Sequence, residues 1–283
     1  MTAILPGLLA ALVWALGNLA ASRGSRAMPP ESLLAGISLV GLAVCAPFLI
    51  AEGAPRDTSA GGLFWLALGG GANIAGLRLL YVAYRTGDVS LVAPITATEG
   101  AVAAVIAIAA GERVQVLVVV LLAVIVLGVV RVAGAHTTQV AATGRFSWTV
   151  VTVTCLAALC FGVGLYASGR ASAHEQFGWI AASPRIVGVF CVALPLALRG
   201  RIRITRVGTP ALLVAACGEV GGFILYSDAA HRSLAVAAVL GSLFAAFAVV
   251  GAAILFGERM NRGQWFGVAL IVVGVAVLSA VHP

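Results

Sequence analysis

The sequence predicts an all-α membrane protein with ten transmembrane helices, arranged as two inverted five-helix repeats. Its 283 residues are 61% hydrophobic and only 10% charged, and the mean hydropathy is +1.10. A soluble domain carries about 25% charged residues, so this composition is typical of a chain that lies in a bilayer. A spanning helix needs about 20 mostly apolar residues. Ten such segments are expected, at residues 3–22, 33–51, 63–84, 89–110, 115–134, 148–169, 178–198, 209–229, 234–256 and 263–281.

An internal repeat divides the chain into two halves. The segment Ile108–Arg113, with the letters IAAGER, returns 146 residues later as ILFGER at Ile254–Arg259. We expect the repeats to occupy residues 1–134 and 148–283, with five helices in each. Because five is odd, the second copy enters the membrane upside down relative to the first. Such an inverted repeat is the usual plan of a secondary transporter. Each Gly-Glu-Arg is expected to end a helix, with its arginine near the negative end of the helix dipole.

Several polar side chains stand inside the first five predicted helices. Trp14 and Asn18 are one turn apart and so share a face, and Asn18 either bonds to another helix or lines a cavity. Arg78 is close enough to a helix end to snorkel to the interface, and a solute or ion-pair role is the other interpretation. Tyr81 belongs either to an interfacial tyrosine belt or to a ligand site. Glu99 stands about ten residues into the fourth helix, which places it about 15 Å deep at 1.5 Å per residue.

The second half carries its own charges at comparable depth. Glu219 lies as deep in the eighth helix as Glu99 does in the fourth. A charge at mid-membrane costs several kcal/mol, so both glutamates should face a cavity or a partner, unless they are protonated and bond between helices. Arg185 follows Pro184, which interrupts the seventh helix, and interrupted helices are favoured positions for binding sites.

Neighbouring helices would pair Arg78 with Glu99, and Arg185 with Glu219. Under the repeat offset, Glu219 corresponds to Asn73, which is therefore also a candidate. The residues expected to bind solute are Glu99, Glu219, Arg78, Arg185, Trp14, Asn18, Tyr81 and Asn73. No catalytic residue, metal site or cofactor is expected, because the four histidines are scattered and no Cys-x-x-Cys pair occurs.

Positive charge predicts the orientation. The net charge of +7 comes from 17 arginines without a lysine, and we interpret them as loop residues that orient the helices rather than as a nucleic-acid surface. Loops after even-numbered helices hold four, Arg56, Arg113, Arg170 and Arg232. Loops after odd-numbered helices hold eleven: Arg23, Arg26, Arg85, Arg131, Arg145, Arg199, Arg201, Arg203, Arg206, Arg259 and Arg262. Positive loops stay cytoplasmic, so both termini are expected outside.

The order of these motifs resembles a known family. Trp14-x-x-x-Asn18, Tyr81 late in the third helix, Pro94 early in the fourth and the repeated Gly-Glu-Arg are similar to the EamA-type branch of the drug/metabolite transporter superfamily. The resemblance implies ten helices, an inverted repeat, a central cavity and movement of small organic solutes. It also implies cytoplasmic termini, against the arginine count. Leu240 stands where a second-half proline would match Pro94.

The leading functional hypothesis is a secondary transporter in the cell (inner) membrane that exports small amphipathic metabolites, such as amino acids, by alternating access. A zwitterion offers its carboxylate to an arginine and its ammonium to a glutamate. A midplane glutamate can also carry a proton, although a facilitator driven by the solute gradient alone stays open. The alternatives are a channel or a divalent-cation transporter of the same fold, and an intramembrane enzyme. The expected partners are the solute and the lipid bilayer, without nucleic acid.

Overall fold

The computed structural model describes residues 3–86, 95–112 and 148–241 continuously, together with residue 92 and parts of 116–131 and 243–277. The described residues are almost entirely helical, and six of their helices are long and apolar enough to cross a membrane. These six are α1 (Ile4–Ala27), α2 (Pro30–Glu52), α3 (Ala60–Thr86), α7 (Trp148–Ser172), the composite helix Phe177–Leu198, and α10 (Thr209–Ala230). They match six of the ten expected spans. Parts of the other four segments lie outside the described residues.

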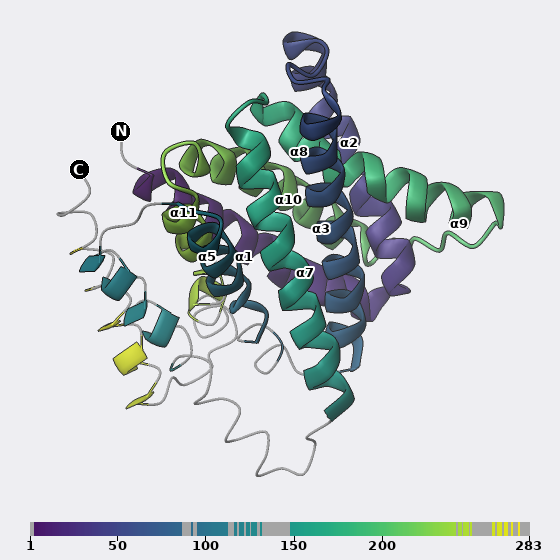
Figure 1. The fold of residues 1–283 in the computed structure, drawn as a ribbon. Helices are drawn as coiled ribbons and strands as arrows, with labels where there is room; N and C mark the ends of the chain where they lie inside the picture. The colour runs from purple at the N-terminus through teal and green to yellow at the C-terminus, as the bar shows by residue number, and fades with distance from the viewer. Residues whose placement is uncertain are drawn as a thin grey trace.

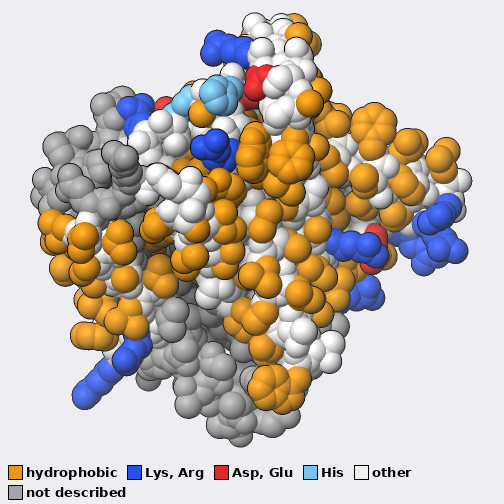
Figure 2. Space-filling view, viewed as in Figure 1, with side chains coloured by type: hydrophobic (Ala, Val, Ile, Leu, Met, Phe, Trp, Pro, Cys, Tyr) orange, Lys and Arg blue, Asp and Glu red, His pale blue; other side chains and the backbone are white. Residues whose placement is uncertain are grey.

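The outer surface of this helical bundle is apolar. On α1, Leu5, Leu9, Leu12 and Leu16 are all exposed, at the spacing of one helix face. Figure 2 shows hydrophobic side chains across the body of the molecule, with arginine, acidic and histidine side chains towards its edges. A continuous apolar surface of this kind is stable against lipid and unstable against water. The chain is therefore a multi-pass membrane protein.

Helices from the two halves of the chain pack against each other in pairs. The most extensive packing joins α1 to α10 and α3 to α7 (Figure 1). Glycines allow the close approach, since a Cβ added to Gly218 of α10 would lie 2.9 Å from the Cα of Gly17 on α1. A Cβ added to Gly164 of α7 would likewise lie 3.4 Å from the carbonyl oxygen of Gly69 on α3. An offset of 147 residues relates Gly17 to Gly164, so both crossings use the same position of the proposed repeat.

The segment expected as one helix over 89–110 is broken in its middle. Residues 97 and 98 form a turn, and α5 (Glu99–Ala109) begins directly after it. Glu99 therefore lies in the first turn of a helix and not about ten residues inside one, which corrects the sequence-based expectation. The hydroxyls of Thr96 and Thr98 donate to the carbonyl oxygens of Val92 and Ile95, at 2.9 and 2.7 Å. Such bonds compete with the helical ladder. Pro94, which the sequence places just before this turn, lies outside the described residues.

A second break occurs at the corresponding place in the other half. Helix α11 (Leu234–Gly241) ends shortly before a turn residue, Leu243. The 146-residue offset carries position 97 onto 243, so the two interruptions match. Paired interruptions in the two halves of a transporter mark the region where solute binds.

The composite helix is also irregular. It consists of α8 (Phe177–Gly188), a π-helical turn η1 (Val189–Ala193) and α9 (Leu194–Leu198). Pro184 was expected to interrupt this helix, but α8 continues through it, and the irregularity lies one turn later. π-Turns are frequent at functional sites, and this one follows Arg185 closely.

Gly111 and Glu112 of the first Gly-Glu-Arg motif end a helix, as predicted, and Arg113 lies outside the described residues. Gly111 has φ +97°, a conformation that glycine adopts without a steric penalty. The N–H of Gly111 donates to the oxygen of Ile108 and that of Glu112 to the oxygen of Ala107, both at 3.0 Å. This is the Schellman pattern of a helix C-terminus. The second copy, at 257–259, lies outside the described residues.

Candidate functional site

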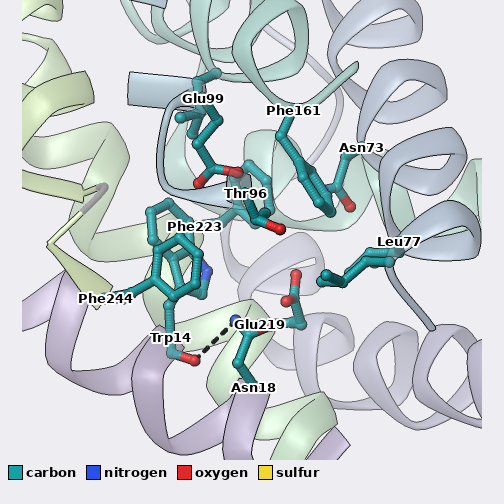
Figure 3. Close-up of a pocket in the computed structure, with 12 residues that line it drawn as sticks. Trp14, Asn18, Asn73, Leu77, Thr96, Glu99, Phe161, Glu219, Phe223 and Phe244 are labelled. Carbon is teal, nitrogen blue, oxygen red and sulfur yellow. Dashed lines mark hydrogen bonds between the residues drawn. The ribbon is translucent and has the colours of Figure 1, made fainter. Parts of the chain in front are cut away.

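A small cavity of about 30 Å³ lies where the broken helices meet the long ones. Its walls come from α1, α3, α5, α7, α10 and the two interrupted segments (Figure 3). The polar lining consists of Asn18, Asn73, Thr96, Glu99 and Glu219, and the apolar lining of Trp14, Leu77, Leu80, Phe161, Leu165, Phe223 and Phe244. About 10–15 Å³ of such space holds one water molecule, so the cavity has room for about two waters. The walls must therefore separate before an organic solute can enter.

Two carboxylates face this cavity. Figure 3 shows the side chains of Glu99 and Glu219 directed into the same space from opposite walls. Glu99 is 6% exposed and Glu219 7% exposed, so both are almost withdrawn from the surroundings. Among the ion pairs of the described residues, Glu99 takes part in none. A cation in the cavity would thus meet one unpaired carboxylate and one that already has a partner.

That partner is Arg185 of α8, whose side chain is completely buried. Its Nη2 donates to Oε2 of Glu219 at 3.3 Å and to Oδ1 of Asn73 at 3.2 Å. Arg185 itself does not line the cavity, because Glu219 and Asn73 stand between it and the open space. The sequence-based pairing of Arg185 with Glu219 is confirmed.

Trp14 forms the aromatic wall of the cavity. Its ring meets Phe223 edge-on, with centroids 5.4 Å apart, and lies 5.8 Å from the ring of Tyr226. The indole lies against Gly222 of α10, where a Cβ would overlap Nε1. Nε1 is buried and has no hydrogen-bond partner among the described residues. Aromatic faces next to carboxylates attract ammonium groups through cation–π contacts.

Asn18 is held by its own helix and by α3. Its Nδ2 donates to the carbonyl oxygen of Trp14 at 3.0 Å, and its Oδ1 accepts a bond from the hydroxyl of Tyr84 at 3.3 Å. Asn18 therefore satisfies both interpretations made from the sequence, because it bonds to a neighbouring helix and also lines the cavity.

Two of the expected site residues lie elsewhere. Arg78 is exposed on α3, and no ion pair of the described residues joins it to Glu99. Tyr81 is 1% exposed but does not line the cavity. The reason is helical periodicity: Asn73, Leu77 and Leu80 follow one face of α3, and Arg78 faces away from it. Tyr81 is buried between helices, so its interpretation as part of an interfacial tyrosine belt is wrong.

Sequence reasoning missed the apolar and hydroxyl part of the wall. Thr96, Phe161, Phe223 and Phe244 carry no charge, and nothing in an apolar sequence distinguishes them from lipid-facing residues. One signal was available, since Phe223 lies one helical turn after Glu219 and must share its face.

The site offers recognition chemistry and no metal centre within the described residues. No group of three or more histidine, cysteine, aspartate or glutamate side chains gathers there in a way that could hold a metal ion. Two carboxylates, two amides, a hydroxyl and an aromatic wall can bind an ammonium group attached to an apolar body.

Comparison with known proteins agrees with this picture. The model of the EamA-like transporter family matches the chain at residues 1–134 and 148–280. A solved crystal structure, titled only as that of a protein, superimposes with a TM-score of 0.77 at 20% sequence identity, covering 99% of this chain and 97% of the other. This likeness concerns the fold. No curated protein sequence matches the chain significantly.

Proposed function

We propose, for a chain that belongs to the EamA-like transporter family, that it exports small amphipathic metabolites bearing an ammonium group, such as amino acids, across the cell (inner) membrane. The observation that carries this proposal is the pair of cavity-lining carboxylates, Glu99 and Glu219, beside an aromatic wall. Buried carboxylates attract an ammonium strongly where water is excluded. The aromatic side chains would take the apolar part of the solute.

Alternating access is the mechanism that we propose. The cavity of about 30 Å³ is too small for an amino acid, which fits a state in which the walls have closed around an empty site. Helices α1 and α10 on one side, and α3 and α7 on the other, form matching packed units. Rocking of such units about a central site is the usual motion of inverted-repeat transporters.

We also propose that Glu99 carries the proton that drives export. Glu99 faces the cavity and has no ion-pair partner among the described residues. A solute ammonium and a proton would then compete for the same carboxylate. Competition of two ligands for one site, combined with alternating access, gives exchange of one for the other across the membrane.

Transport in proteoliposomes tests the central site. Glu99→Gln and Glu219→Gln should each lower initial solute flux by about tenfold or more, the equivalent of about 1.4 kcal/mol or more of binding or barrier energy. The matched control is Asp57→Asn, which neutralises a half-buried loop acid outside the cavity and should keep normal flux. A panel of amino acids, amines and inorganic cations at equal protein incorporation identifies the solute. Unchanged flux in both glutamate variants would refute the central site.

A further inference from the structure

Arg185 has more hydrogen-bonding capacity than the protein uses. A guanidinium has five N–H donors, and in Arg185 only Nη2 has acceptors, on Glu219 and Asn73. The Nε and Nη1 groups are buried without a partner among the described residues. A buried charged donor without an acceptor costs more than the hydrogen bond that it lacks. Because Arg185 is bonded to Glu219 and Asn73 and does not itself line the cavity, an anionic group can reach these donors only if the ion pair with Glu219 opens.

The surrounding helices hold this guanidinium in place. Gly41 of α2 faces the aliphatic stem, and a Cβ there would lie 2.7 Å from Cδ of Arg185. Glycine at this position therefore lets α2 close over the stem. The other end of the side chain is held by Asn73 of α3 and Glu219 of α10. A rigid, planar guanidinium with free donors is well suited to bind a carboxylate through two hydrogen bonds.

We infer that the Arg185–Glu219 ion pair opens to admit a zwitterionic solute, whose carboxylate binds Arg185 while its ammonium binds between Glu219 and Glu99, which face the same cavity. The inference rests on the proposed function and narrows its solute class. In the closed state one buried cation pairs with one buried carboxylate. Insertion of a zwitterion gives Arg185 a carboxylate and gives Glu219 and Glu99 a shared ammonium, so no charge of the site is left without a partner.

Solutes with a single charge lack this balance. An amine without a carboxylate can bind between Glu219 and Glu99 only by leaving Arg185 without its carboxylate, and at Glu99 alone it contacts one carboxylate in place of two. A carboxylic acid without an amine can take Arg185 only by leaving Glu219 unpaired. Breaking a buried ion pair on one side is strongly destabilising. The pair should therefore sort zwitterions from amines and from acids that have the same apolar body.

Three ligands with one carbon skeleton test this specificity: leucine, its decarboxylated amine and its deaminated acid. Binding is measured by calorimetry on the full-length, detergent-solubilised protein, because the amine and the acid cross bilayers without a carrier. Wild type should bind leucine at least about tenfold more tightly than either analogue, a difference of about 1.4 kcal/mol.

The single variants should change selectivity in opposite directions. Arg185→Gln leaves Glu219 alone and should favour the amine, whereas Glu219→Gln leaves Arg185 alone and should favour the acid. Arg185→Lys keeps the charge and should keep the preference for leucine, which distinguishes recognition from loss of folding. Arg170→Gln, an exposed arginine outside the cavity, serves as the matched control and should behave as wild type.

Two outcomes separate this inference from the proposed function. If wild type binds the amine as tightly as leucine, and Arg185→Gln does not change that ratio, the ion pair has no role in recognition although the central site stands. If none of the three ligands binds wild type while a different solute depends on Glu99 and Glu219 for flux, the zwitterion class is wrong. If flux is also independent of both glutamates, the proposed function fails with it.

Discussion

Trp14 and Gly222 show how closely single residues define the candidate site. The indole of Trp14 lies flat against α10 only because Gly222 has no side chain. On the other side, a Cβ on Gly241 would lie 3.1 Å from the same ring. The aromatic wall is therefore positioned by two glycines, from α10 and α11. A side chain at either position would push the ring towards the cavity or out of its edge-on contact with Phe223.

A methyl group at Gly222 tests this positioning. Gly222→Ala should destabilise the protein by about 1–3 kcal/mol, the usual cost of overpacking a buried contact, and should weaken solute binding because Trp14 must shift. Gly221→Ala is the control on the same helix, since its Cβ would meet only Val13 Cγ1 at an ordinary 3.5 Å. Thermal unfolding in detergent and calorimetry measure the two effects. Equal behaviour of both variants would show that the ring is not held by Gly222.

Charged and polar residues of the site were the part that the sequence could predict. Glu99, Glu219 and Asn73 line the cavity, because a polar side chain at mid-membrane has few stable positions other than a cavity or a partner. Arg78 shows the limit of that argument, since a long side chain near a helix end can also reach the surface. Apart from Trp14, the aromatic lining could not be predicted, because lipid and a solute cavity both accept apolar side chains.

At the scale of helices, one end of the bundle is fastened by a buried carboxylate. Glu175, between α7 and α8, is 2% exposed. Its two oxygens accept the backbone N–H groups of Arg56 and Asp57, at 3.0 and 2.7 Å. Nearby, Glu52 at the end of α2 accepts the N–H of Gly178 at 3.1 Å. These bonds join the α2–α3 loop to the start of α8, which belong to different halves of the chain.

At the opposite end of the bundle, the loop between α9 and α10 is joined to the α1–α2 region by hydrogen bonds between uncharged groups. There the N–H of Arg203 donates to the hydroxyl of Ser32 at 3.0 Å, and the hydroxyl of Thr205 donates to the carbonyl oxygen of Ala27 at 3.2 Å. The repeat offset of 147 residues relates Glu175 to Met28, a side chain that cannot replace a carboxylate. Hydrogen bonds to a charged group are stronger than neutral ones, so the two ends of the bundle differ in how firmly they are closed.

Removing the carboxylate tests whether it closes its end. Glu175→Ala leaves two backbone N–H groups without acceptors, which should cost about 1–3 kcal/mol and raise hydrogen exchange across residues 53–59. The matched control is Asp228→Asn. It removes a surface ion pair with Arg232 whose side chains are both 38% exposed, and exposed pairs contribute little. Exchange at 53–59 that is equal in both variants would contradict the fastening role.

At the scale of the whole molecule, the sequence predicted the helical spans well and their interruptions poorly. Apolar length alone places α1, α2, α3, α7 and α10 to within about five residues of the expected segments. The turns at 97–98 and at Leu243 leave no mark in hydropathy, and the first of them coincides with the hydroxyl bonds of Thr96 and Thr98. The inverted repeat remains a proposal, supported by the matching helix pairs and the matching breaks.

The orientation of the molecule is a separate prediction. Because eleven arginines follow odd-numbered predicted helices and four follow even-numbered ones, the positive-inside rule places both termini outside. A phosphatase fused after Pro283 should then be active in the periplasm, and a fluorescent protein fused there should stay dark. A fusion that fluoresces would support the cytoplasmic termini that the resemblance to EamA-type transporters implies.

Coupling of solute export to protons depends on the whole transport cycle. If a solute ammonium and a proton compete for Glu99, an inward proton gradient should accelerate efflux of leucine from loaded proteoliposomes. Glu99→Gln cannot bind the proton, so its efflux should ignore the pH step while exchange of labelled for unlabelled leucine continues at a reduced rate. Asp57→Asn should respond to the pH step as wild type does. Wild-type efflux that follows the leucine gradient alone, whatever the pH step, would mean that Glu99 is only an ammonium contact and that the protein is a facilitator.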